Sequence, residues 1–185
     1  MKNVILIFGA SGSGTTTLGQ KICGELGYTR MDTDDYFWMP TTPPFTQKRP
    51  REERIELIKK DINEAENAVL SGSIAGWGDA LIPYFTLAVR IEMDHNLRME
   101  RLLNREKQRF GSRIEPGGDM YEHHLAFVEW AKTYDTGGVD VRSKAKHDVW
   151  QKLLPCEILH LDGADSVEEN FLKVKQILMR RQPHP

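Results

Sequence analysis

The chain has 185 residues, of which 39% are hydrophobic and 28% charged, close to the average for a globular domain. Its formal net charge is −2, from 25 lysines and arginines against 27 aspartates and glutamates. A nearly neutral chain has no overall basic field, so we expect no nucleic acid and no membrane among its partners, and any anion site must be local.

The first apolar run predicts a strand in the middle of a sheet. Val4–Phe8 is unbroken and β-branched, which is typical of a strand buried on both faces. The run is too short for a membrane span and leads directly into glycines, so we expect no signal peptide. Cys23 and Cys156 are far apart and form no Cys-x-x-Cys motif, so neither a zinc knuckle nor a disulfide framework is indicated. We therefore expect a cytoplasmic protein.

Strands and helices are then predicted to alternate along the chain. Leu18, Ile22 and Leu26 recur every four residues, which predicts a helix that Gly27 ends. The further predicted strands are about 28–32, 69–70, 85–93 and 157–161. Four further helices are predicted: one after the proline-rich stretch that ends at Pro50, one over 96–110, one over 121–134 and one after Ser166.

Alternating strands and helices indicate parallel strands joined by right-handed crossovers. We therefore predict one doubly wound α/β domain over residues 1–185, without repeats or low-complexity tracts.

A phosphate-binding loop is the most specific motif. Residues 9–17 match G-x-x-x-x-G-K-[ST] at every fixed position except one, because Thr15 stands where lysine is expected. A buried strand precedes the motif and an amphipathic helix follows it, so its N–H groups can converge on phosphate at a helix N-terminus. The alternative is a glycine-rich turn that binds nothing. The predicted nucleotide-binding residues are Gly9, Ser11, Gly12, Ser13, Gly14, Thr15, Thr16 and Thr17, with Thr16 as a Mg²⁺ ligand.

With this motif the chain resembles the P-loop small-molecule kinases of the nucleoside-monophosphate and shikimate kinase type over nearly its whole length. It is most similar to bacterial adenylate-kinase-like P-loop proteins that share the lysine-free loop Gly-Ala-Ser-Gly-Ser-Gly-Thr-Thr-Thr. The resemblance implies a P-loop NTPase fold with a parallel five-stranded sheet of order 2-3-1-4-5, a helical lid over about 98–150, and ATP and Mg²⁺ as cofactors. The adenylate kinase signature Asp-Gly-[Phe/Tyr]-Pro-Arg is absent after the third strand, so AMP is not indicated as the acceptor.

Two aspartates at the end of the second predicted strand resemble the Asp-x-Asp element of shikimate-kinase-like enzymes. The resemblance implies that Asp32 helps to hold Mg²⁺ through water and that Asp34 grips or deprotonates the acceptor hydroxyl. Phosphoryl transfer needs a carboxylate beside the attacking hydroxyl and another near the metal. An acidic turn or a helix cap at Asp34 or Asp35 is the alternative.

Arginines recur along one face of the helix predicted over 96–110. The helix carries Arg98, Arg101, Arg105 and Arg109 at spacings of three or four residues, and its helical wheel places Glu100 and Glu106 elsewhere. The stripe resembles the lid of these kinases, which implies that Arg105 and Arg109 act on the transferring phosphate in place of the missing lysine. A solvated helix face is the alternative.

Three further residues are candidates for acceptor binding. Arg54 falls where the family has its acceptor-binding arginine, and Trp77 and Asp79 follow the third predicted strand, at the edge of the sheet where ligands bind in such folds. We therefore predict an ATP- and Mg²⁺-dependent phosphotransferase that binds a nucleoside triphosphate and a small-molecule acceptor. The alternative is a nucleotide-binding sensor, or a slow ATPase that a partner protein stimulates.

Overall fold

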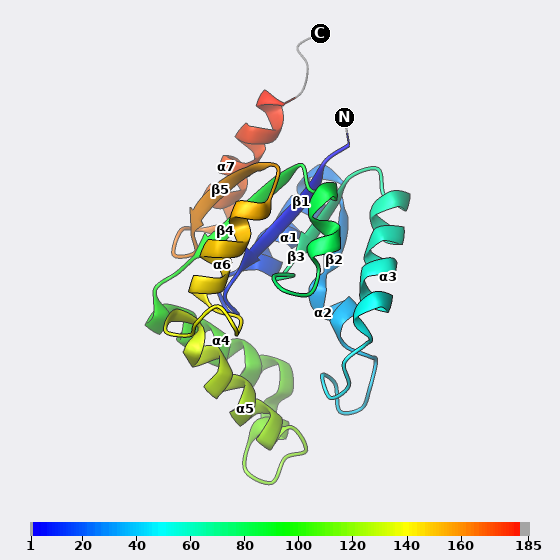
Figure 1. Ribbon diagram of the computed structural model, residues 1–185. Coiled ribbons are helices and arrows are strands. Elements are labelled where there is room, and N and C mark those ends of the chain that lie inside the picture. Colours follow the sequence, from blue (N-terminus) through cyan, green and yellow to red (C-terminus); the bar gives the residue numbers. More distant parts are fainter. Residues whose placement is uncertain (1, 182–185) are drawn as a thin grey trace.

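The computed structural model describes residues 2–181, and within them five parallel strands form one sheet of order β2-β3-β1-β4-β5 (Figure 1). This is the order that we predicted. The strands are β1 (Val4–Gly9), β2 (Thr29–Asp32), β3 (Ala68–Ser71), β4 (Leu87–Glu92) and β5 (Glu157–Asp162). The central strand β1 pairs with β3 and β4, with Ile5 opposite Val69 and Leu87.

Helices cover both faces of the sheet. The α-helices are α1 (Thr15–Leu26), α2 (Thr33–Phe37), α3 (Arg51–Glu64), α4 (His95–Phe110), α5 (Tyr121–Lys132), α6 (Lys144–Trp150) and α7 (Val167–Arg180). The short 3₁₀ helices are η1 (Asp79–Tyr84), η2 (Gly111–Ile114), η3 (Thr133–Asp135) and η4 (Gln151–Leu153). No helix in the described part of the chain is long and apolar enough to cross a membrane.

Alternate side chains of β1 enter two separate cores. The side chains of Leu6 and Phe8 pack in a core with α3 and α6, whereas those of Ile5 and Ile7 pack with α1 and α7. Because successive side chains of a strand point to opposite faces, an unbroken apolar strand needs helices on both sides. The sequence analysis predicted this burial from the same run.

Local capping signals define the helix ends that the sequence predicted. Asp94 accepts hydrogen bonds from the backbone N–H groups of Asn96 and Leu97 at the start of α4. Ser166 and Glu169 form a reciprocal capping box at the start of α7. Such caps satisfy N–H groups that otherwise have no partner within the helix.

Helices α4 and α5 project beyond the carboxyl edge of the sheet, where β1 leads into the P-loop (Figure 1). They pack on each other through a small core of their own, which includes Met99, Leu102 and Val128. Helix α6 falls within the range 98–150 that the resemblance assigned to a lid, yet Trp150 of α6 packs in the sheet core with Phe8. Among the described helices in that range, α4 and α5 are the ones that pack in a core apart from the two cores of the sheet.

Candidate active site

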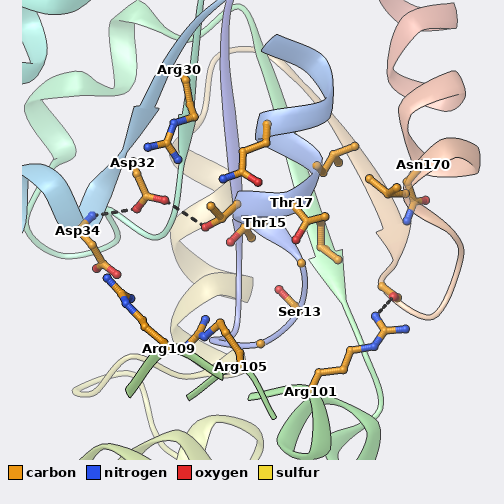
Figure 2. Close-up of a pocket in the computed structure, with 18 of the residues that line it drawn as sticks. Ser13, Thr15, Thr17, Arg30, Asp32, Asp34, Arg101, Arg105, Arg109 and Asn170 are labelled. Atoms are coloured by element: carbon orange, nitrogen blue, oxygen red, sulfur yellow. Dashed lines mark hydrogen bonds between the residues drawn. The ribbon is translucent and has the colours of Figure 1, made fainter. Parts of the chain in front are cut away.

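A cleft of about 580 Å³ lies at the carboxyl edge of the sheet, at the start of α1 (Figure 2). Residues 12–18 of the P-loop and α1 form its floor. The end of β2 and the start of α2 line one end, and the loop between β5 and α7 lines the other. Arginines of α4 lie across from the P-loop. The position agrees with the rule that ligands of parallel α/β sheets bind beyond the carboxyl ends of the strands.

The P-loop leaves the N-terminus of α1 free to bind an anion. Gly12 and Gly14 have φ angles of 88° and 99°, a left-handed conformation that favours glycine. The helix begins at Thr15, and its N-cap residue Gly14 has no side chain that could accept hydrogen bonds from the first turn. Those N–H groups and the positive end of the helix dipole therefore face the cleft without a side-chain cap. This is the geometry of a phosphate site.

Gly9 and Ser11 belong to the same loop but do not line the cleft, whereas residues 12–17 do. The side chain of Ser13 is 1% exposed, and its Oγ has no hydrogen-bond partner within residues 2–181. Unpaired buried hydroxyls are unusual in folded proteins. A ligand at the loop would find a free donor there.

Thr16 and Asp32 form the pair that the sequence predicted for Mg²⁺. The Thr16 hydroxyl donates a hydrogen bond to Asp32 Oδ2 over 3.1 Å, which Figure 2 draws as a dashed line at Asp32. A hydroxyl beside a carboxylate is a donor set of the hard oxygens that Mg²⁺ prefers, and the ion usually keeps several waters besides one or two carboxylates and phosphate oxygens. The residues present fit a Mg²⁺ ion that a bound triphosphate brings with it.

The two aspartates of the Asp-x-Asp element have different environments. Asp32 also caps the short helix α2, because its Oδ1 accepts a hydrogen bond from the Asp34 backbone N–H over 3.1 Å. We considered a helix cap at Asp34 or Asp35 as the alternative, and the cap is present but is formed by Asp32. The other carboxylate oxygen of Asp32 accepts the hydrogen bond from Thr16. Asp34 accepts no side-chain hydrogen bond within the described chain. Its pKa is raised, first because the surrounding protein partly desolvates its carboxylate and second because Asp32 is negative, while Arg142, Arg105 and Arg109 oppose the shift.

The arginines of α4 separate into a buried one and three that line the cleft. Arg98 is 1% exposed and forms an ion pair with Asp135, so our prediction of one shared face is wrong for this residue. Arg101 donates to the Gly163 carbonyl oxygen over 2.7 Å, at the far end of the cleft from Asp34. Burial of Arg98 follows from the packing of α4 and α5, which a helical wheel of α4 alone does not contain.

Arg105 and Arg109 face the cleft, and both charges act on Asp34. Arg105 donates to Glu106 Oε1 over 3.0 Å, so this carboxylate pairs with one arginine of the stripe although it also lies 3.9 Å from His124 of α5. Arg109 has no ion pair in the described chain, and its guanidinium lies 4.6 Å from the centre of the Phe45 ring. In Figure 2 both side chains approach from the side opposite α1. Sequence reasoning missed Phe45, which lines the cleft with a φ of 62° at the end of a proline-rich turn.

The three further residues that we predicted for acceptor binding lie outside the lining of this cleft. Arg54 is 8% exposed, and its guanidinium stacks 3.8 Å from the centre of the Phe37 ring. The edge of Phe37 meets Trp77, so these three residues form one group beside α2. The carboxylate of Asp79 instead accepts a hydrogen bond from the Trp150 indole over 2.8 Å.

Further polar residues near the site escaped the sequence analysis. Arg30 lines the cleft beside Asp32, from which it is two residues away on β2 and therefore on the same face. Arg142 donates to the Gly9 carbonyl oxygen over 2.9 Å. The period of two along β2 is a signal that could have found Arg30, whereas nothing local to Arg142 indicates its contact with a loop 133 residues away.

Solved structures of other proteins share this fold. A shikimate kinase from Bacteroides thetaiotaomicron superposes with a TM-score of 0.58 at 14% identity, over 96% of this chain and 98% of that one. A shikimate kinase from Acinetobacter baumannii, solved in complex with shikimate, superposes with a TM-score of 0.58 at 13% identity. The match covers 100% of this chain and 97% of that one. An uncharacterized protein from Eubacterium ventriosum ATCC 27560 superposes with a TM-score of 0.55 at 12% identity. The match covers 98% of this chain and 100% of that one. The chain has the P-loop kinase fold.

Sequence comparison places the chain within a family. It is 43% identical over 178 residues to the Bacillus subtilis (strain 168) "Uncharacterized protein YqaC", a match that covers 96% of this chain and 98% of the relative. The chain therefore belongs to the YqaC family. No protein-family model matches it.

Proposed function

We propose that the chain is an ATP- and Mg²⁺-dependent phosphotransferase that acts on a small-molecule acceptor: a nucleotide, a nucleoside or a small hydroxy metabolite. One observation carries the proposal: Thr16, Asp32 and Asp34 stand in one cleft with an uncapped helix N-terminus. Phosphoryl transfer needs a phosphate cradle, oxygen ligands for the metal and a carboxylate near the acceptor. The cleft offers all three within a few residues of β1 and β2.

The orientation of the nucleotide follows from the two ends of the cleft. The γ-phosphate must approach Asp34 and the acceptor, so the base and sugar extend toward Gly163 and Asp165 at the opposite end. Thr16 is a direct Mg²⁺ ligand in this proposal, and Asp32 acts through water. When bound, Mg²⁺ neutralises charge on the β- and γ-phosphates. The N–H groups of the P-loop hold the β-phosphate.

In the transfer step the acceptor hydroxyl oxygen forms a bond to the γ-phosphorus, and the bond from that phosphorus to the β,γ-bridging oxygen breaks. ADP leaves with that oxygen, and the hydroxyl proton passes to the Asp34 carboxylate. The raised pKa of Asp34 makes its carboxylate a better proton acceptor than an ordinary aspartate. We assign Arg105 and Arg109 to the charge on the transferring phosphoryl group. Arg54 and Trp77 remain our candidates for contacts to the acceptor, and so does Asp79, whose carboxylate also accepts a hydrogen bond from the Trp150 indole.

Thr15 favours a second function. A loop without its lysine lacks a cation at the β- and γ-phosphates, and loss of one such group costs on the order of 10²–10³ in rate. A nucleotide sensor, or a slow ATPase that a partner protein stimulates, tolerates such a loss. Neither function requires Asp34 beside cationic residues, which is why we favour the phosphotransferase.

The test is a screen for ADP release from Mg·ATP in the presence of single nucleosides, nucleotides, and small polyols or hydroxy acids. We expect one chemical class to stimulate ADP release and to yield a phosphorylated product that mass spectrometry detects. Asp34→Asn is the matched control, because it preserves size and should remove the stimulation. Stimulation by a macromolecule alone would favour the coupled ATPase, and ATP binding without any stimulation would favour the sensor.

A further inference from the structure

Two arginines contact the backbone of the P-loop from outside the cleft. Arg142 Nη2 donates to the Gly9 carbonyl oxygen over 2.9 Å, and Arg98 Nη1 donates to the Ser11 carbonyl oxygen over 3.2 Å. Neither arginine is among the residues that line the cleft. In an anion-binding loop the N–H groups converge on the ligand, so carbonyl groups are left for contacts elsewhere. Guanidinium groups on these carbonyls stabilise the orientation in which the N–H groups face the phosphates.

The charge of Arg98 is compensated. Its Nη2 donates to Asp135 Oδ2 over 2.9 Å and to the Ala131 carbonyl oxygen over 3.1 Å. Burial alone would raise the pKa of Asp135, but hydrogen bonds from His95 and Arg98 hold it below its usual value, so the carboxylate stays ionised. The backbone of α4 also touches the loop: a Cβ on Gly12 would lie 2.7 Å from the Arg98 carbonyl oxygen. Arg98 is therefore a neutralised anchor between α4, α5 and the loop.

The charge of Arg142 is not compensated by an ion pair within residues 2–181. Its only hydrogen bond there is to Gly9, and its Nε is buried without a partner. Its guanidinium lies 5.5 Å from the centre of the Trp130 ring. Burial lowers the pKa of Arg142, and the negative charge of Asp34 opposes that shift. The side chain is half-buried, and a partly desolvated cation is costly without an anion. The unpaired guanidinium beside the loop therefore suggests that the anion is a ligand.

We propose that Arg142 is a positioning residue for the P-loop that supplies, from behind the loop, the positive charge that Thr15 lacks. It fixes the Gly9 carbonyl and raises the electrostatic potential at the loop N–H groups, and Arg98 holds the neighbouring Ser11 carbonyl. The inference rests on the proposed binding of a nucleoside triphosphate, but not on transfer to an acceptor. It also separates two roles: Arg142 acts on ground-state affinity, whereas Arg105 and Arg109 act on the transferring group.

The experiment is a double-mutant cycle between Arg142→Gln and Thr15→Lys, with dissociation constants for ADP and Mg·ATP measured by calorimetry. Glutamine can still donate to the Gly9 carbonyl but carries no charge. Interactions with a charged partner are worth about 1.5–3 kcal/mol, so we expect affinity for both nucleotides to fall about ten- to a hundredfold. Thr15→Lys should restore most of that loss in the Arg142→Gln background, and should improve the affinity of the unmutated protein by less.

Two further variants separate charge from folding. Arg142→Lys keeps the charge, so it should retain most of the affinity even though its donor geometry differs. Arg113→Gln removes an exposed arginine whose ion pair with Asp119 lies outside the cleft lining, and should leave both dissociation constants unchanged. Thermal unfolding of each variant confirms that folded protein is compared.

Several outcomes overturn the inference. The inference fails if Arg142→Gln binds ADP and Mg·ATP within twofold of the unmutated protein. It also fails if Thr15→Lys does not recover the affinity that Arg142→Gln loses. A rise in acceptor KM alone would instead place Arg142 on the acceptor. If the unmutated protein binds neither ADP nor Mg·ATP, the proposed function itself fails, which is a distinct result.

Discussion

Acid should destabilise the protein through a single buried imidazole. His147 of α6 is 0% exposed, and its ring nitrogens each share a 2.8 Å hydrogen bond, Nε2 with the Ser73 hydroxyl and Nδ1 with the Tyr134 hydroxyl. The Phe8 ring meets it edge-on at 5.3 Å. Burial, and then the charges of Arg142 and other nearby cations, lower the pKa of His147 from 6.5 to about 3. The folded protein therefore holds this ring neutral at any pH above about 4.

The size of the effect follows from proton linkage. In the unfolded chain His147 takes up a proton as the pH falls below about 6.5, while the folded chain does not, so the unfolded state binds more protons. Stability then falls as the pH falls, by up to about 1.4 kcal/mol per pH unit. Between pH 7 and pH 5 the loss from this one group amounts to about 2 kcal/mol, a large share of the roughly 5–15 kcal/mol that holds a domain folded.

The assay is urea unfolding of the unmutated protein and of His147→Gln at pH 7, 6 and 5. The variant should be less stable at pH 7 because it loses ring packing and a hydrogen bond. Its stability should then fall by about 2 kcal/mol less between pH 7 and pH 5, since glutamine does not titrate. Comparison of the two proteins cancels the contribution of every other titrating group. Equal pH dependence in both would refute the claim that His147 is neutral in the folded state.

Three further predictions concern the cleft. Thr16→Ala should weaken Mg·ATP far more than metal-free ATP in calorimetry, because the hydroxyl is a metal ligand; equal losses would argue against that role. Asp34→Asn should abolish transfer and leave ATP affinity within a few-fold. In the unmutated protein, kcat/KM should fall as the pH is lowered, and the fall should begin above the usual aspartate pKa, because Asp34 must be ionised to act as the base and its pKa is raised. Unchanged turnover would remove Asp34 from the mechanism. Phe45→Leu should lower kcat about two- to fivefold through loss of a cation–π contact of about 0.5–1 kcal/mol with Arg109, whereas Phe45→Tyr should retain it; identical kcat values for the two variants would show that the ring does not position Arg109.

Features that depend on neighbouring residues could be predicted from the sequence. The P-loop is specified by a contiguous strand, glycines and helix, and the caps at Asp94 and Ser166 involve residues no more than three positions away. The motif indicated Thr16 and the resemblance indicated Asp32 as residues for Mg²⁺, and the structure joins the two by a hydrogen bond. The strand order came from resemblance rather than from the residues, since alternation alone fits several orders.

Contacts between distant segments could not be predicted in this way. Arg98 and Arg142 reach P-loop carbonyls 87 and 133 residues away, and a charged side chain gives no local sign that it will be buried. The same limit applies to Phe45. Its ring packs against Phe110 only because the turn before α3 bends toward the end of α4. A proline-rich stretch indicates irregular structure but not the direction in which the chain turns.

The charges around the cleft show why cations behind the loop matter. Its lining contains four arginines, at positions 30, 101, 105 and 109, and four aspartates, at positions 32, 34, 35 and 165, so their formal charges cancel. A triphosphate remains anionic even with Mg²⁺ bound, and a cleft with balanced side chains gives it no net attraction. Attraction must then come from the N–H groups at the start of α1 and from charge beyond the lining. In our proposal Arg142, whose guanidinium donates to the Gly9 carbonyl oxygen, is such a charge, and we expect Thr15→Lys to make it redundant.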